Sequence, residues 1–98
     1  MKKIAIALFV LIVAAGVTFV LLRPQLATKQ YEKGLSLTDS AQFEQAIKKF
    51  DKAIWLNKKD ANFYNARGMA YTFLQNSSAA IADFDKAIEL NSEVSDFS

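Results

Sequence analysis

The residue types that most often carry enzyme chemistry are scarce in this chain. Its 98 residues include no cysteine and no histidine. This composition excludes thiol catalysis, disulfides, lipoprotein-type attachment and cysteine-ligated zinc, and it removes the commonest general base. Asp83 and Asp85 are the nearest approach to a catalytic acid pair, but at i and i+2 they point to different faces of a helix. Without a phosphate loop, nucleophile elbow or zinc motif, we expect no enzyme activity, no cofactor and no bound metal.

The charge of the chain is unevenly distributed. Lys and Arg number 12 against 10 Asp and Glu, and Lys2 and Lys3 account for the whole difference. The remainder is neutral, so its charge gives no reason to expect a nucleic-acid partner. Residues 23–59 are mainly basic and residues 60–98 mainly acidic. Such a gradient can guide a partner or a second copy of the chain, although ordinary solvated faces explain it equally simply.

The sequence begins with a long apolar stretch. Residues 4–22 contain no charged side chain and only one polar one, Thr18. As a helix, 19 residues span about 28 Å, close to the thickness of a hydrocarbon core. We expect residues 1–23 to form a single-pass membrane anchor or a signal segment, with Pro24 ending the helix. Residues 24–30 should form a juxtamembrane connector that merges into the first helix of the repeats.

A cleaved signal peptide is the alternative to an anchor. Residues 13–15 could precede a cleavage site at Gly16, but the segment stays apolar beyond that point. Cleavage would yield a secreted or periplasmic protein. Positive charge flanks the apolar stretch on both sides, which weakens the usual orientation rule. The short N-terminus with two lysines still favours a soluble part on the outer, periplasmic or extracellular, side.

Residues 27–94 contain an internal repeat. "FDKAIWLN" begins at Phe50 and "FDKAIELN" begins at Phe84, and residues 27–60 align with residues 61–94 without a gap. Alanine, isoleucine, phenylalanine and leucine recur in each copy at steps of three and four, which predicts an amphipathic helix. Glycine inside a helix costs about 1 kcal/mol relative to alanine. Gly34 and Gly68 should therefore mark places where a neighbouring helix leaves no room for a Cβ atom.

This period and pattern resemble the tetratricopeptide repeat, a 34-residue helix–turn–helix unit. The resemblance covers residues 27–60 as repeat 1 and residues 61–94 as repeat 2, followed by a tail at 95–98. Lys58 and Ser92 replace the proline that usually ends the unit, and Gln30 and Tyr64 stand at its early tryptophan. The fold implied is all-α, a solenoid of two repeats preceded by a hydrophobic transmembrane helix. The residues that match the family's packing positions are Gly34, Ala46, Phe50, Ala53, Gly68, Tyr71, Ala80 and Ala87.

The same resemblance implies a protein-binding groove lined by the first helix of each repeat. Family members that hold a terminal carboxylate use lysine, arginine and asparagine there, whereas Leu35 and Met69 stand at matching sites here. An apolar or extended segment of a protein or peptide therefore suits this groove better. The alternative is that the apolar side chains simply pack between neighbouring helices. The implied lining is Thr28, Tyr31, Leu35, Thr38, Asn62, Asn65, Met69, Thr72 and Phe73.

Two further surfaces are candidate interfaces. Trp55 aligns with Glu89, so we expect its side chain to lie on the outer surface of its helix. There it could anchor a protein interface, rest against the membrane surface or lie flat on its own helix. Solenoid repeats bury their faces only against a neighbour, so the surface around Ile81, Phe84 and Ile88 should be partly uncovered. It would recruit a protein partner or a second copy, and a shortened or fragmentary reading frame is a further explanation.

The expected function combines these elements. The sequence predicts a membrane-anchored scaffold that binds a protein or peptide partner in its groove and contacts the membrane through residues 4–22. The alternatives are a secreted or periplasmic adaptor and a small oligomerising subunit of a membrane assembly.

Overall fold

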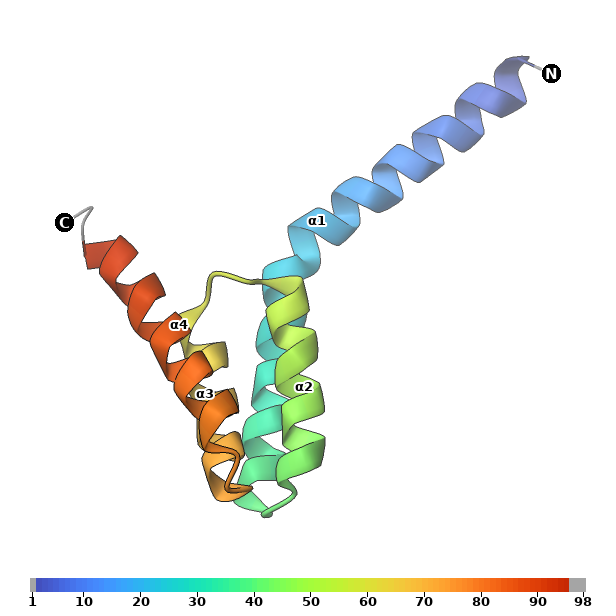
Figure 1. Ribbon diagram of the computed structural model, residues 1–98. Helices are drawn as coiled ribbons and strands as arrows, with labels where there is room; N and C mark the ends of the chain where they lie inside the picture. The colour runs from blue at the N-terminus through green and yellow to red at the C-terminus, as the bar shows by residue number, and fades with distance from the viewer. Residues whose placement is uncertain (1, 96–98) are drawn as a thin grey trace.

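The chain folds into four α-helices, seen in a computed structural model that describes residues 2–95. They are α1 (Lys2–Asp39), α2 (Phe43–Leu56), α3 (Ala61–Phe73) and α4 (Ser77–Ser95). The C-terminal part of α1 pairs with α2, α3 pairs with α4, and α2 packs on α3 (Figure 1). The described residues contain no strand. The all-α fold with two helical hairpins and a long apolar N-terminal helix is confirmed.

The expected helix end at Pro24 is wrong, because α1 continues through this proline to Asp39. Proline removes one backbone donor and crowds the carbonyl one turn earlier, which costs about 3 kcal/mol inside a helix. Packing offsets this cost, since Ala27 and Gly34 in the following turns are buried against the bundle. The helix changes direction where its apolar part leaves the bundle (Figure 1). Residues 24–30 are helical and join the apolar segment to the first helix of the bundle without a break.

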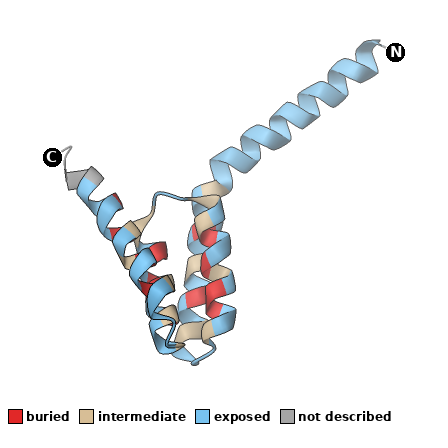
Figure 2. Ribbon diagram, viewed as in Figure 1, coloured by how far each residue is buried: buried red, intermediate tan, exposed pale blue. Residues whose placement is uncertain are grey.

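The hydrophobic core lies between the two hairpins. Phe50 of α2 and Phe63 of α3 are its largest fully buried side chains. Small residues surround them, including Ala46 and Ala53 on α2 and Ala66 on α3. Small side chains let the helix axes approach so that the two rings fill the space between them. Figure 2 shows that buried residues are confined to the bundle, while the N-terminal part of α1 is exposed throughout.

A short turn joins the two helices of each hairpin. Residues 40–42 join α1 to α2, and residues 74–76 join α3 to α4. Ala41 and Gln75, which occupy equivalent positions in the two repeats, both have a positive φ, at 59° and 63°. Asp60 caps α3, where its side chain accepts a hydrogen bond from the Asn62 backbone N–H at 3.0 Å. The proposed tail begins at the end of α4, and residues 96–98 lie outside the described part.

Candidate functional site

A small hollow lies between α1 and α3, the first helices of the two hairpins. It has a volume of about 100 Å³. Steps of three and four residues place its lining on one face of each helix. Six of the nine residues expected in the groove meet here, together with Ala66, which the sequence did not suggest. They are Tyr31, Leu35 and Thr38 from α1 and Asn62, Asn65 and Met69 from α3.

The lining of this hollow combines apolar and uncharged polar side chains. The Leu35 and Met69 side chains are 38% and 48% exposed, so both are accessible to a partner. The Thr38 hydroxyl donates a hydrogen bond to the Gly34 carbonyl at 2.9 Å, so its proton is already used. Asn62 and Asn65 supply amide groups that can donate to or accept from a peptide backbone. No charged side chain lines the hollow among the described residues, so its chemistry suits an uncharged segment.

Three of the residues expected in the groove lie elsewhere. Phe73 stacks on Phe43 of α2, with ring centroids 4.7 Å apart and an interplanar angle of 10°. This contact holds Phe73 against the other hairpin, outside the hollow. The hydroxyls of Thr28 and Thr72 donate to backbone carbonyls of their own helices, at Pro24 and Gly68. None of these three residues lines the α1–α3 hollow.

Each hairpin is closed by a glycine facing a phenylalanine ring. A Cβ atom on Gly34 would lie 2.6 Å from Cδ1 of Phe50, and one on Gly68 would lie 2.8 Å from Cε1 of Phe84. Real Cβ atoms essentially never approach so closely. The glycines therefore let α1 contact α2 and α3 contact α4. The remaining packing residues lie in or against the core: Ala46, Ala53, Ala80 and Ala87 are buried, and Tyr71 packs against the Phe50 cluster.

An ion cluster that sequence analysis missed joins the two hairpins through Arg67 of α3. Its Nε and Nη2 donate to the Asp83 carboxylate at 2.9 and 2.7 Å, and its Nη1 donates to Asp51 at 2.9 Å. Hydrogen bonding to Asp83, and secondarily to Asp51, raises the pKa of Arg67 although burial opposes this. Asp83 is only 4% exposed, so this acid is a structural ion-pair partner.

Lysines gather on the outer surface of the first hairpin. Repulsion by Lys52, then burial, then repulsion by Lys33 lower the pKa of Lys49. Lys33 and Lys49 occupy the positions in repeat 1 that Arg67 and Asp83 occupy in repeat 2. The second hairpin therefore has an ion pair where the first has two cations.

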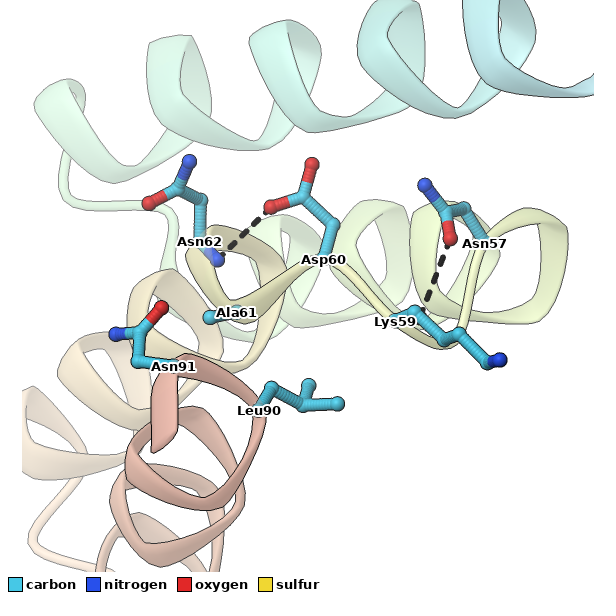
Figure 3. A pocket seen from close by; sticks show the side chains of 7 residues that line it. All are labelled: Asn57, Lys59, Asp60, Ala61, Asn62, Leu90 and Asn91. Carbon is cyan, nitrogen blue, oxygen red and sulfur yellow. Dashed lines mark hydrogen bonds between the residues drawn. The ribbon is translucent and has the colours of Figure 1, made fainter. Parts of the chain in front are cut away.

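A polar hollow of about 310 Å³ lies where the α2–α3 loop meets the end of α4 (Figure 3). Asn57 accepts a hydrogen bond from the Lys59 backbone N–H at 3.2 Å, and Asp60 caps α3. The Tyr64 hydroxyl donates to the Lys58 carbonyl at 3.0 Å. These bonds hold the loop in which the usual proline is absent. The side chains of Asn57 and Asp60 thus stabilise the loop that connects the two hairpins.

Trp55 lies beside the apolar part of α1. It is 64% exposed, and its ring centroid is 6.4 Å from that of Phe19. The Arg23 guanidinium lies 5.9 Å from the centroid of the same phenylalanine ring. The exposed tryptophan and the arginine therefore mark the end of the apolar segment. That segment is long and apolar enough to cross a membrane, and none of it is buried, but a signal sequence meets the same criteria.

Known proteins identify the repeat. Residues 61–94 match the family model "Tetratricopeptide repeat". Residues 61–94 form a tetratricopeptide repeat. Its matched repeat has the bounds expected for repeat 2 and comprises α3 and most of α4. Solenoids of this kind present extended concave surfaces to protein partners, so the fold is that of an interaction scaffold.

A solved structure supports the fold of the chain. The chain is similar to "MamA MSR-1 C2", with a TM-score of 0.65 and 21% sequence identity. The alignment covers 84% of this chain and 56% of the other, so the chain spans little more than half of that structure's length. No curated protein matches the sequence.

Proposed function

We propose that the protein is a membrane-anchored scaffold that binds an uncharged segment of a protein partner in the hollow between α1 and α3. The observation that carries this proposal is the convergence of six side chains from two helices on one accessible hollow. Leu35 and Met69 offer apolar contact, and methionine adapts readily to different side chains. Asn62 and Asn65 offer amides to the backbone of an extended segment. The proposal divides the chain into an anchor at 1–23 and repeats at 27–60 and 61–94.

The continuity of α1 supports the anchored arrangement. The helix that lines the hollow is the same helix that contains the apolar segment. Tryptophan and arginine are favoured at the membrane–water boundary, and Trp55 and Arg23 lie together at the end of that segment. The repeats would therefore be held close to the bilayer. Tethering raises the local concentration of the scaffold, so a modest groove affinity suffices for binding.

Replacing Leu35 or Met69 by lysine should reduce capture of the partner by the full-length chain about tenfold. Each change puts a charge into an uncharged apolar site, and one buried apolar side chain is worth about 1.5–3 kcal/mol. The measurement is a quantitative pull-down from detergent-solubilised membranes. Phe73→Lys is the matched control, because Phe73 lies outside the hollow and should alter capture less. Equal yields of the same proteins with all three variants would exclude the hollow as the binding surface.

The full-length chain should remain in the membrane fraction after an alkaline wash, and its intact mass should include the apolar segment. Leu11→Arg should release a substantial share, because a charge at the centre of a spanning helix costs about 2.5–3.5 kcal/mol. Leu11→Val is the control. A mature chain that begins at Gly16 would establish cleavage and favour the released adaptor. Protease protection of the repeats in sealed vesicles would test their placement on the outer side.

A further inference from the structure

The outer surface of the second hairpin, which we call the end face, is apolar and uncovered. It is formed by Asn65 of α3 and by Ile81, Phe84, Asp85 and Ile88 of α4. Ile81 and Ile88 are 59% and 64% exposed, and Phe84 is half-buried. Isolated exposed apolar residues are ordinary, but these recur at helical spacing on one surface.

The first hairpin shows what covers an equivalent surface. The residues of repeat 1 that align with Ile81, Phe84 and Ile88 are Ile47, Phe50 and Ile54. Ile47 and Phe50 are buried against Ala66 and Ala70 of α3. Phe63 of the same helix lies in a site formed by Ala27 and Ala53, with Tyr31 and Ile54 packed around it. The Tyr31 and Phe63 ring centroids are 5.1 Å apart.

The end face has a hollow at the place that corresponds to this Phe63 site. Its volume is about 280 Å³. Four residues that line it are the repeat 2 equivalents of four of the five that surround Phe63; the fifth, Leu56, corresponds to Leu90, which lies outside this hollow. They are Ala61, Asn65, Ala87 and Ile88. Phe84, Asn62 and Asn91 complete the lining. The shape that receives an aromatic ring between the hairpins is thus present a second time on the outside.

The acidic residue that Arg67 binds on the first hairpin also has an equivalent on the second. Arg67 of α3 reaches across to Asp51 of the first hairpin, with Nη1 and Oδ1 2.9 Å apart. Asp85 is the repeat 2 equivalent of Asp51 and is exposed on α4. Among the ion pairs of the described residues, none involves Asp85. A helix that lay on the end face as α3 lies on the first hairpin would bring a basic side chain to this carboxylate.

We propose that the end face binds an amphipathic helix of a partner protein whose contact pattern is that of α3. The pattern is a phenylalanine, a small residue three positions later, an arginine four later and a small residue seven later. In α3 these are Phe63, Ala66, Arg67 and Ala70. The phenylalanine enters the hollow of the end face, the small residues lie over Phe84 and Ile81, and the arginine pairs with Asp85.

A second copy of the chain fits this face poorly. Head-to-tail stacking would bring the start of one copy's first hairpin onto the end face of another. The residues of α1 at the four pattern positions are Lys29, Glu32, Lys33 and Ser36. Lys33 would then meet Asp85, but Lys29 and Glu32 would stand where the pattern has a phenylalanine and a small residue. Burying these two charged side chains against isoleucine and phenylalanine is costly. The occupant is therefore a helix of a different protein.

A labelled peptide of residues 58–76, which contains α3 and its capping Asp60, tests this proposal. It is titrated against the full-length chain in detergent micelles. The matched control is the peptide of residues 24–42, which presents the four polar residues of α1 at the same positions. We expect saturable binding of the first peptide, at least about tenfold tighter than the control, because only the first buries a phenylalanine. Equal affinity of the two peptides would overturn the proposal.

Charge exchange locates the contact. Asp85→Arg should weaken binding of the α3 peptide about fivefold, because an exposed attraction becomes a repulsion. A peptide carrying Arg67→Asp should recover affinity on the Asp85→Arg chain and not on the unchanged chain. Ile88→Lys in the chain should abolish binding of both the α3 peptide and its Arg67→Asp form. Absence of this recovery would contradict the assigned orientation. Concentration-dependent self-association that Ile88→Lys abolishes would identify a second copy as the occupant and would also overturn the proposal.

Discussion

Replacing Arg67 by alanine should lower the free energy of unfolding by about 3 kcal/mol. The change leaves the Asp83 carboxylate, whose side chain is 6% exposed, without the two hydrogen bonds that Arg67 donates. An unpaired buried charge is strongly destabilising, whereas its complete replacement by apolar residues is often tolerated. The measurement is urea unfolding of the full-length chain in mild detergent, followed by far-ultraviolet circular dichroism.

Asp51→Asn is the matched control for this prediction. It removes the other contact of the same guanidinium, but Asp51 is 53% exposed, so its loss should cost less than about 1 kcal/mol. A double variant with Arg67→Met and Asp83→Leu should recover much of the stability, since no charge is then buried. If Arg67→Ala and Asp51→Asn proved equally mild, the buried pair would not be important for the stability of the second hairpin.

Replacing Phe50 by alanine should destabilise the bundle by about 4 kcal/mol. The ring is fully buried and is held by the face of Gly34 on one side and by small side chains of α2 and α3 on the other. Larger neighbours such as Tyr31 and Leu37 fill only part of the space that the ring leaves, so both the transfer and the cavity contributions are lost. The same urea measurement applies, with a corresponding decrease in Tm.

Phe84→Ala tests the equivalent position of repeat 2. Phe84 faces Gly68 as Phe50 faces Gly34, but it is only half-buried because the end face is uncovered. Its loss should cost about 2 kcal/mol, half the cost at Phe50, because less apolar area is removed from contact. Equal costs at the two positions would show that the end face is covered in the free protein.

The repeat made much of the bundle predictable. Two copies of one amphipathic pattern indicated the helices that became α2 and α4, and the interior glycines indicated close contact with another helix. Steps of three and four also brought Leu35 and Met69 to one hollow. These predictions succeeded because they depend on helical periodicity, which is a local property of the sequence.

Other features could not be predicted locally. Pro24 is a strong stop signal, but the packing of the following turns keeps α1 continuous. Ala41 and Gln75 adopt positive φ values without a glycine to indicate the turn. Phe73 has the periodicity of a groove residue, but its ring stacks on Phe43 of the other hairpin. At Pro24 and Phe73, contacts between segments distant in sequence outweigh the local preference.

The sequence by itself determined the helical class, the repeating unit, the close-packing glycines and an apolar segment of membrane-spanning length, because each follows from residue type and spacing. Only the tertiary structure decided that this segment and the first groove helix are one helix, and that Arg67 links both hairpins. It also decided that the Phe63 site recurs on the outer surface. The reason is that these features depend on the relative placement of helices, which the packing of side chains across the two hairpins sets.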